Sequence, residues 1–99
     1  MLEYSAIRDA IQKLGASVTE EHLHPEVFGS AYCIFEGENH SHIRLVWDGK
    51  EGYGFLQSEK SPGLWESIGP HVSDTSSHNS KLVELLAIAK GLLHGNVPV

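Results

Sequence analysis

The stretch from Ile43 to Leu56 constrains the fold of this chain of 99 residues more than any other segment. Two runs of branched and aromatic residues flank the sequence Asp-Gly-Lys-Glu-Gly, whose composition is typical of a turn. Because side chains alternate between the two faces of a strand, we expect Ile43, Leu45 and Trp47 on one face and the residues between them on the other. The segment therefore predicts an antiparallel hairpin with one strongly apolar face.

Helical periodicity marks both ends of the chain. Apolar residues three and four positions apart predict one helix over residues 2–14 and a second helix from about 79 to 93. Gly91 lies in the last turn of the second helix, where it indicates close packing or fraying. Residues 96–99 are expected to form a loose tail.

Between the helices, short apolar runs bounded by turn residues predict strands. Three strands are expected, over residues 28–36, 41–48 and 52–58. Residues 64–69 fit either a fourth short strand or a turn of helix. Residues 16–27 show no clear period and predict a connector with a short extended piece.

These elements predict one α+β domain over residues 1–99, in the order helix, three or four strands, helix. The strands should form an antiparallel meander packed on one face by the N- and C-terminal helices, which leaves the other face open. Most strand aromatics, including Tyr53 and Phe55, are expected in the core, and Trp65 is the one favoured on the open face. Residues 71–80 should form an exposed loop.

The charge balance narrows the classes of partner. With 13 acidic and 7 basic residues, the chain carries a formal charge of −6. This charge argues against nucleic acid as a partner and is compatible with a basic protein, which it would attract. There is no run of about 18 apolar residues and no basic-then-apolar leader, so we expect neither a membrane span nor a signal peptide. Together with a single cysteine, this composition predicts a cytoplasmic protein.

Seven histidines are the least usual feature of the composition, and four of them form two His-x-His pairs. On an extended chain, residues two apart point the same way, so each pair could hold one metal ion. The weak candidate ligands are His22, His24, His40 and His42. Neither pair has a partner motif at fixed spacing, and hydrated surface histidines are the favoured interpretation.

No residue shows the surroundings that a catalytic group needs. Cys33 lies in the middle of a predicted strand, without a neighbouring histidine or cation, and is interpreted as buried apolar filler. The chain contains no Gly-x-Ser-x-Gly motif and no phosphate-binding glycine loop. We therefore expect no catalytic residue and no cofactor.

The sequence Arg-Leu-Val-Trp-Asp-Gly-Lys-Glu-Gly-Tyr at residues 44–53 resembles a pattern in small bacterial immunity-type proteins of polymorphic toxin systems. In these proteins a strand ending in Val-Trp-Asp-Gly leads through a glycine turn into an aromatic strand. The resemblance covers residues 28–58 and departs from the pattern at Gly54, where an aromatic residue is expected on the open face. It implies a protein that neutralises a toxin by occlusion, with no catalytic residue of its own.

The leading hypothesis is therefore a non-enzymatic module that binds a basic protein, such as a toxin domain. Its candidate contacts are acidic and aromatic residues of the open face and nearby loops: Glu36, Glu38, Asp48, Glu51, Glu59, Trp65, Glu66 and Asp74. Two alternatives remain. One is a metal-binding protein or hydrolase-like enzyme that uses the His-x-His pairs, and the other is a structural or regulatory homodimer.

Overall fold

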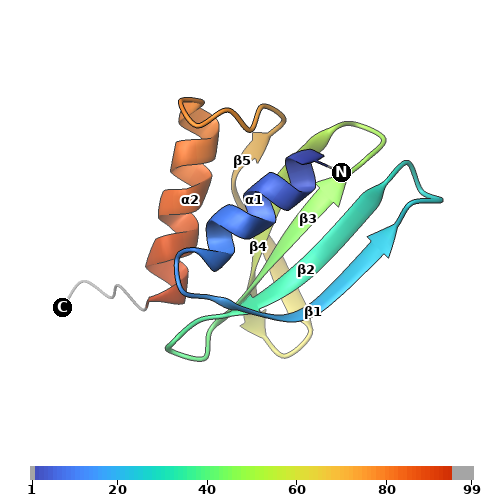
Figure 1. Ribbon diagram of the computed structural model, residues 1–99. Helices are drawn as coiled ribbons and strands as arrows, with labels where there is room; N and C mark the ends of the chain where they lie inside the picture. Colours follow the sequence, from blue (N-terminus) through green and yellow to red (C-terminus); the bar gives the residue numbers. More distant parts are fainter. Residues whose placement is uncertain (1, 95–99) are drawn as a thin grey trace.

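The computed structural model describes residues 2–94, and the tail predicted at 96–99 lies outside the described residues. Figure 1 shows a helix near each end of the chain, with a run of strands between them. The elements are α1 (Leu2–Gln12), β1 (Ser17–His24), β2 (Ser30–Glu36), β3 (His42–Asp48), β4 (Tyr53–Ser61), β5 (Leu64–Val72) and α2 (Ser80–Leu93).

The five strands form one antiparallel sheet in the order β1-β2-β3-β4-β5. Neighbours in the sequence are thus neighbours in the sheet, and each connection is a hairpin. The hairpin predicted from Ile43 to Leu56 is β3–β4, in which Leu45 lies opposite Leu56 and Asp48 opposite Tyr53. The predicted α+β fold, with an antiparallel meander between two helices, is confirmed.

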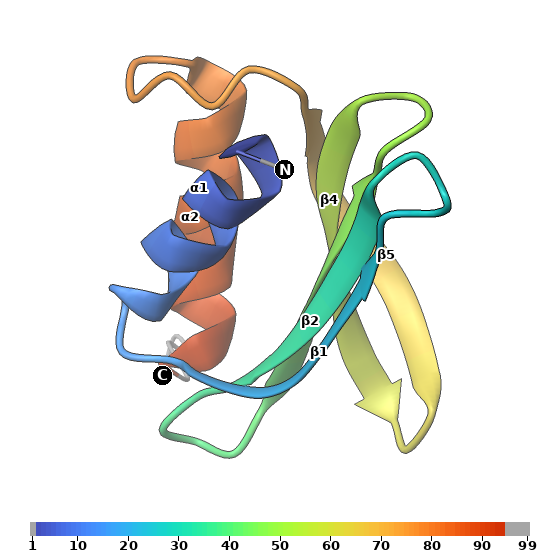
Figure 2. The ribbon, with the colours of Figure 1, turned by 45° about the vertical axis from the view of Figure 1, so that its right-hand side comes forward.

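Both helices cover the same face of the sheet, as predicted. Figure 2 shows the sheet turned nearly edge-on, with α1 and α2 on one side of it and no element on the other side. The core fills the space between the helices and this covered face. Its fully buried large side chains come from both helices and from strands β2 to β5: Tyr4, Ile7, Ile11, Cys33, Phe35, Ile43, Leu45, Leu56, Val72, Leu85 and Leu93.

Alternation along the strands decides which aromatic residues enter the core. Trp47 shares a face with Leu45 and is only 6% exposed. Tyr53 and Phe55 have the opposite parity and lie on the open face, so the prediction that most strand aromatics belong to the core is wrong for both. Gly54 faces the core instead, where an added Cβ would lie 3.0 Å from the Trp47 ring. The expected aromatic at this position would therefore not have been on the open face.

The prediction of a connector over residues 16–27 is wrong, because Ser17–His24 forms β1 along the full length of β2. β1 is an edge strand whose residues are mostly exposed, and only Val18 and Leu23 in it are apolar. Its register shifts by a bulge between Val18 and Glu20. An exposed edge strand with a bulge has no reason to show an apolar alternation, which is why its sequence resembles a loop.

Residues 64–69 belong to a strand, and the loop predicted from residue 71 begins only after Val72. Gly69 has a φ of 75°, a left-handed conformation that interrupts the regular pairing of β5 with β4. This irregularity lets the strand continue through Pro70 to His71 and the buried Val72. β5 is the second edge of the sheet, where a proline costs no ladder hydrogen bond.

Polar contacts cap the start of α2 and hold its end against the rest of the molecule. Asn79 caps the N-terminus by accepting a hydrogen bond from the Lys81 amide. At the other end, the carbonyl of Leu92 accepts hydrogen bonds from Asn39 Nδ2 and, at 2.7 Å, from Ser41 Oγ in the β2–β3 turn. The ring of His94 donates from Nε2 to the carbonyl of Leu14, which follows α1.

Candidate functional site

The open face of the sheet is the largest feature that the helices leave uncovered. In β2 and β3, every second residue is buried on the helix side and the residues between are half-buried on the open side. The open side is rich in aromatic rings, imidazoles and charged groups. Its central members are Tyr32, His42, Arg44, Val46, Asp48, Tyr53, Phe55, Glu59 and Trp65.

This face is hollowed at the end where the β1–β2 and β3–β4 turns meet. The hollow has a volume of about 500 Å³. Small side chains such as Ser30 and Val46 line it together with larger rings, and Asp48 adds a carboxylate. Its full lining is His24, Val27, Phe28, Ser30, Ala31, Tyr32, Val46, Trp47, Asp48, Lys50, Tyr53 and Phe55. A hollow of this size with an apolar lining and few polar groups is typical of a binding site.

The rim of the hollow is formed by two turns packed tightly together. Phe28 has a φ of 56°, which a bulky side chain rarely adopts, and it is 68% exposed. An added Cβ on Gly49 would lie 2.1 Å from the Phe28 carbonyl oxygen, so only glycine permits this approach. The Gly49 amide also donates to Ser30 Oγ at 3.0 Å. The turn that holds Phe28 is therefore fixed against the β3–β4 turn.

Ring stacks form both sides of the hollow. On the β1–β2 side, the His22 and Tyr32 rings stack with their centres 4.7 Å apart. On the β4–β5 side, Tyr53 and His71 stack at 4.3 Å, and Phe55 lies 5.4 Å from the same imidazole. Stacked rings lose little conformational freedom when they bind a partner, because their rotamers are already restricted.

Arg44 lies at the centre of the open face between two aromatic rings. Its guanidinium carbon is 4.5 Å from the centre of the Trp65 ring and 5.5 Å from that of Tyr32. Its Nε donates to Gln57 Oε1 at 2.7 Å. Such contacts between a cation and aromatic faces are favourable, and they join Tyr32 of β2 to Trp65 of β5 through Arg44 of β3.

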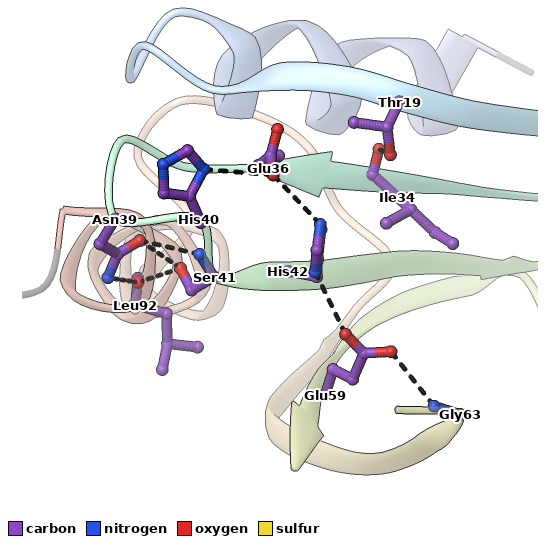
Figure 3. A network of polar contacts seen from close by, with 10 residues as sticks. All are labelled: Thr19, Ile34, Glu36, Asn39, His40, Ser41, His42, Glu59, Gly63 and Leu92. Atoms are coloured by element: carbon purple, nitrogen blue, oxygen red, sulfur yellow. Dashed lines mark hydrogen bonds and ion pairs between the residues drawn. The ribbon is translucent and has the colours of Figure 1, made fainter. Parts of the chain in front are cut away.

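The end of the face opposite the hollow carries a chain of carboxylates and imidazoles (Figure 3). His42 lies between Glu36 of β2 and Glu59 of β4, with Nε2 3.4 Å from Glu36 Oε2 and Nδ1 3.1 Å from Glu59 Oε1. His40 Nδ1 is 3.6 Å from the same Glu36 oxygen. A neutral imidazole has one N–H and can donate to one carboxylate, whereas a protonated imidazole can donate to both.

The structure brings together some of the predicted contact residues and separates others. Glu36, Glu59 and Trp65 share the open face, and Glu59 lies directly opposite Trp65 in the ladder. Trp65, which the sequence favoured if one tryptophan left the core, lies on the open face beside Arg44. Asp48 also belongs to the open face, at the end that holds the hollow. The others lie elsewhere: Glu51 in the β3–β4 turn, Glu38 in the β2–β3 turn near His94, Glu66 beside Lys60 and Asp74 after β5.

The two His-x-His pairs differ in their surroundings. His22 and His24 stack on edge strand β1, and His22 Nε2 is 2.8 Å from Glu20 Oε2. His40 and His42 each approach a carboxylate of the network in Figure 3. Among residues 2–94, no group of three or more His, Cys, Asp or Glu side chains is placed to hold a metal ion. The geometry thus adds nothing to the metal hypothesis.

Cys33 is buried on the covered face, as the sequence predicts. Burial raises the pKa of its thiol to about 11, which keeps the group protonated at neutral pH. Beside it, the buried Tyr4 hydroxyl donates to Glu21 Oε2 at 2.6 Å, and Arg8 Nη1 donates to the same oxygen at 2.9 Å. These two donors lower the pKa of the Glu21 carboxyl, with the tyrosine contact the larger cause.

Sequence reasoning missed several residues of the hollow and of the ring stacks beside it. Tyr32 and Val46 could have been found from strand alternation. Val46 lies two residues after Arg44 on β3, and Tyr32 lies opposite Val46 on β2. Phe28 was assigned to the start of a strand, but β2 begins at Ser30 and Phe28 belongs to the preceding turn. His71 was assigned to a loop. No local pattern identifies these two, because their positions depend on turn geometry and on the bulge in β5.

Comparison with known proteins finds no matching family model and no significant match to a curated protein or a solved structure. None of the helices in the described part of the chain is long and apolar enough to cross a membrane.

Proposed function

We propose that this protein is a non-enzymatic binding module that docks a basic partner protein on the open face of its sheet. The observation that carries the proposal is the hollow of about 500 Å³ in a face that neither helix covers. Around it, Tyr32, Tyr53 and Phe55 present preformed ring surfaces, the side-chain type most enriched among residues that dominate binding energy.

Charge complementarity supports a basic partner. The chain carries a formal charge of −6, and Glu36, Glu59 and Asp48 lie at the two ends of the open face. Opposite charge on the partner would steer the encounter, after which the aromatic anchors would be buried. The resemblance at residues 44–53 to immunity-type proteins adds a specific form of this proposal, in which the partner is a toxin domain that is neutralised by occlusion.

The test is co-expression with the product of the gene that adjoins this one in its genome. We expect that product to arrest growth, and this chain to relieve the arrest and to co-purify with it. Replacing Phe55 by Ser and Trp65 by Ala should abolish both effects, because each removes an aromatic anchor from the open face.

Val83→Ala is the matched control, since Val83 is 54% exposed on α2 and lies in the helical layer on the opposite side of the sheet. Loss of rescue in Val83→Ala with full rescue in the double variant would place the interface on the helices and contradict the proposal. A neighbouring product that is neither toxic nor bound would contradict the toxin-neutralising form of it.

A further inference from the structure

The hollow combines aromatic faces with one carboxylate, and this combination suits a particular kind of side chain. We infer that the hollow accepts an arginine side chain of the partner, with the guanidinium stacked on the rings of Tyr32, Tyr53 and Phe55 and paired with Asp48. The inference rests on the proposed function and deepens it, because it names the group that anchors the basic partner.

Asp48 supplies the charge for this pairing. Its Oδ1 accepts hydrogen bonds from the backbone amides of Lys50 and Glu51, at 3.1 and 3.0 Å. These two contacts fix the carboxylate at the edge of the hollow that it lines. Within residues 2–94, its Oδ2 accepts no hydrogen bond, so one oxygen remains to receive a guanidinium N–H.

The open face already binds one guanidinium in the same manner. Arg44 stacks against Trp65 and Tyr32 and donates to an oxygen of Gln57. Rings and an oxygen acceptor are the same elements that the hollow offers on the other side of Val46. A planar guanidinium fits such a site better than an ammonium, because it stacks on rings while it donates in its own plane.

Among the described residues, Lys50 is the one lysine or arginine in the lining, and it lies at the rim of the hollow. Its Nζ is 5.9 Å from the centre of the Phe28 ring, at the rim. Lys50 should therefore weaken the binding of a second cation through charge repulsion without blocking the hollow. The two charges should therefore have opposite effects on arginine binding: loss of the Asp48 charge weakens it, and loss of the Lys50 charge strengthens it.

The experiment is an NMR titration of the full chain with N-acetyl-arginine methylamide, in which the aromatic ring resonances are followed. N-acetyl-citrulline methylamide, which has nearly the same shape without the charge, and N-acetyl-leucine methylamide are titrated in parallel. We expect the arginine derivative to shift the Tyr32, Tyr53 and Phe55 rings and to bind about fivefold more tightly than either neutral compound.

Two variants test these opposite effects. Asp48→Asn keeps the oxygen that caps the turn, and we expect it to weaken arginine binding about three- to fivefold. Lys50→Gln should strengthen it about twofold. Asp74→Asn is the matched control, because it removes the same charge at a position away from the hollow. Asp74 also accepts a backbone hydrogen bond in a turn through Oδ1. This variant should leave the affinity unchanged.

Equal or tighter binding of a neutral compound would overturn the inference, as would the absence of ring shifts or equal effects of Asp48→Asn and Asp74→Asn. These outcomes are independent of the co-expression test. A chain that rescues growth through its open face but shows no preference for arginine would retain the proposed function and lose only the arginine site.

Discussion

At the scale of single residues, the backbone of Phe28 is the clearest case of stability given up at a candidate site. A left-handed φ of 56° costs a bulky residue about 1 kcal/mol relative to asparagine or glycine. The side chain gains little burial in return, since it is 68% exposed. Strain of this kind is commonly retained where the side chain is needed for binding.

We therefore predict that Phe28→Asn stabilises the fold and weakens partner binding. The gain should be about 0.5–1 kcal/mol in the free energy of unfolding, because asparagine tolerates the left-handed region. Urea denaturation measures the gain, and co-purification with the partner measures the loss. A variant that is less stable than the natural chain would show that the Phe28 side chain contributes to folding.

The contact of Tyr4 and Arg8 with Glu21 gives a prediction about acid stability. The pKa of Glu21 is lowered in the folded state, so the carboxylate stabilises the fold above its unfolded pKa, near 4.5. This contribution is lost as the pH falls through the lower, folded pKa. Glu21→Gln should therefore destabilise the protein at pH 7, and the difference from the natural chain should shrink steadily below about pH 4.5.

Denaturant unfolding between pH 7 and pH 3 measures this difference. Glu20→Gln is the control, because Glu20 is the adjacent residue, is half-exposed and contacts only His22 among the described residues. It should change stability by less than about 0.5 kcal/mol at either pH. A Glu21→Gln difference that grows as the pH falls would contradict the assigned contact.

At this scale, sequence alternation identified the covered and open residues of β3 correctly, whereas in β4 it placed Tyr53 and Phe55 on the wrong side. Leu45 and Trp47 are buried, and Arg44 and Val46 are on the open side. What alternation could not show is the role of Gly49. Its conformation is not left-handed, and the need for glycine arises only because the Phe28 carbonyl approaches it. Contacts between two turns are absent from any local pattern.

At the scale of elements, the two rim turns should behave as one unit. We predict that Gly49→Ala destabilises the protein by about 2–3 kcal/mol, because the new Cβ meets backbone that cannot move without separating the turns. Gly63→Ala isolates the cost of a left-handed residue, since no atom lies near its Cβ position, and should cost about 1 kcal/mol. Urea denaturation measures both losses of unfolding free energy. Equal losses in Gly49→Ala and Gly63→Ala would contradict the packing argument.

In helix α2, replacing a glycine by alanine should raise the stability of the protein rather than lower it. An added Cβ on Gly91 would have nothing within 4 Å, so the close packing suggested by the sequence does not occur at this position. Gly91→Ala should stabilise the protein by about 0.5–1 kcal/mol, because alanine restricts the unfolded chain and favours helix. Thermal unfolding measures the gain as a rise of about 2–8 °C in the midpoint.

Gly37→Ala is the counterpart on the turn that packs against the same helix. Its Cβ would lie 2.2 Å from the Leu93 carbonyl oxygen, so the midpoint should fall. Stabilisation by both substitutions would show that glycine at position 37 is not required for the contact with α2.

Edge strands explain where the prediction of elements failed. The inner strands and both helices were predicted because each buries a continuous apolar face. β1 buries little and carries Glu20, Glu21 and two histidines, so its pairing with β2 depends on backbone hydrogen bonds that leave no pattern in the sequence. β5 was ambiguous for a related reason, since Gly69 and Pro70 interrupt it.

At the scale of the whole molecule, a sheet with two helices at the chain ends could be predicted to have one covered face, and this is confirmed. The hollow in the other face could not be predicted. It exists because the strands curve and because distant turns, around residues 28 and 49, meet at one end of the sheet. Curvature and long-range contact are properties of the assembled sheet, and the sequence carries them only indirectly.

The charge of the molecule leads to a final prediction, on its association with the proposed basic partner. Imidazoles take up protons between pH 8 and pH 5, and protonation of all seven histidines would change the formal charge from −6 to +1. Association should therefore slow as the pH falls from 7.5 to 5.5, by about tenfold at roughly 50 mM salt.

Biosensor kinetics with the co-purified partner measure this effect, which should shrink at about 500 mM salt because long-range attraction is screened. The expected change is in the association rate, because steering acts before contact and ring burial mainly sets dissociation. Faster association at pH 5.5 would mean that the docking face attracts an acidic partner, and the assignment of a basic one would be wrong.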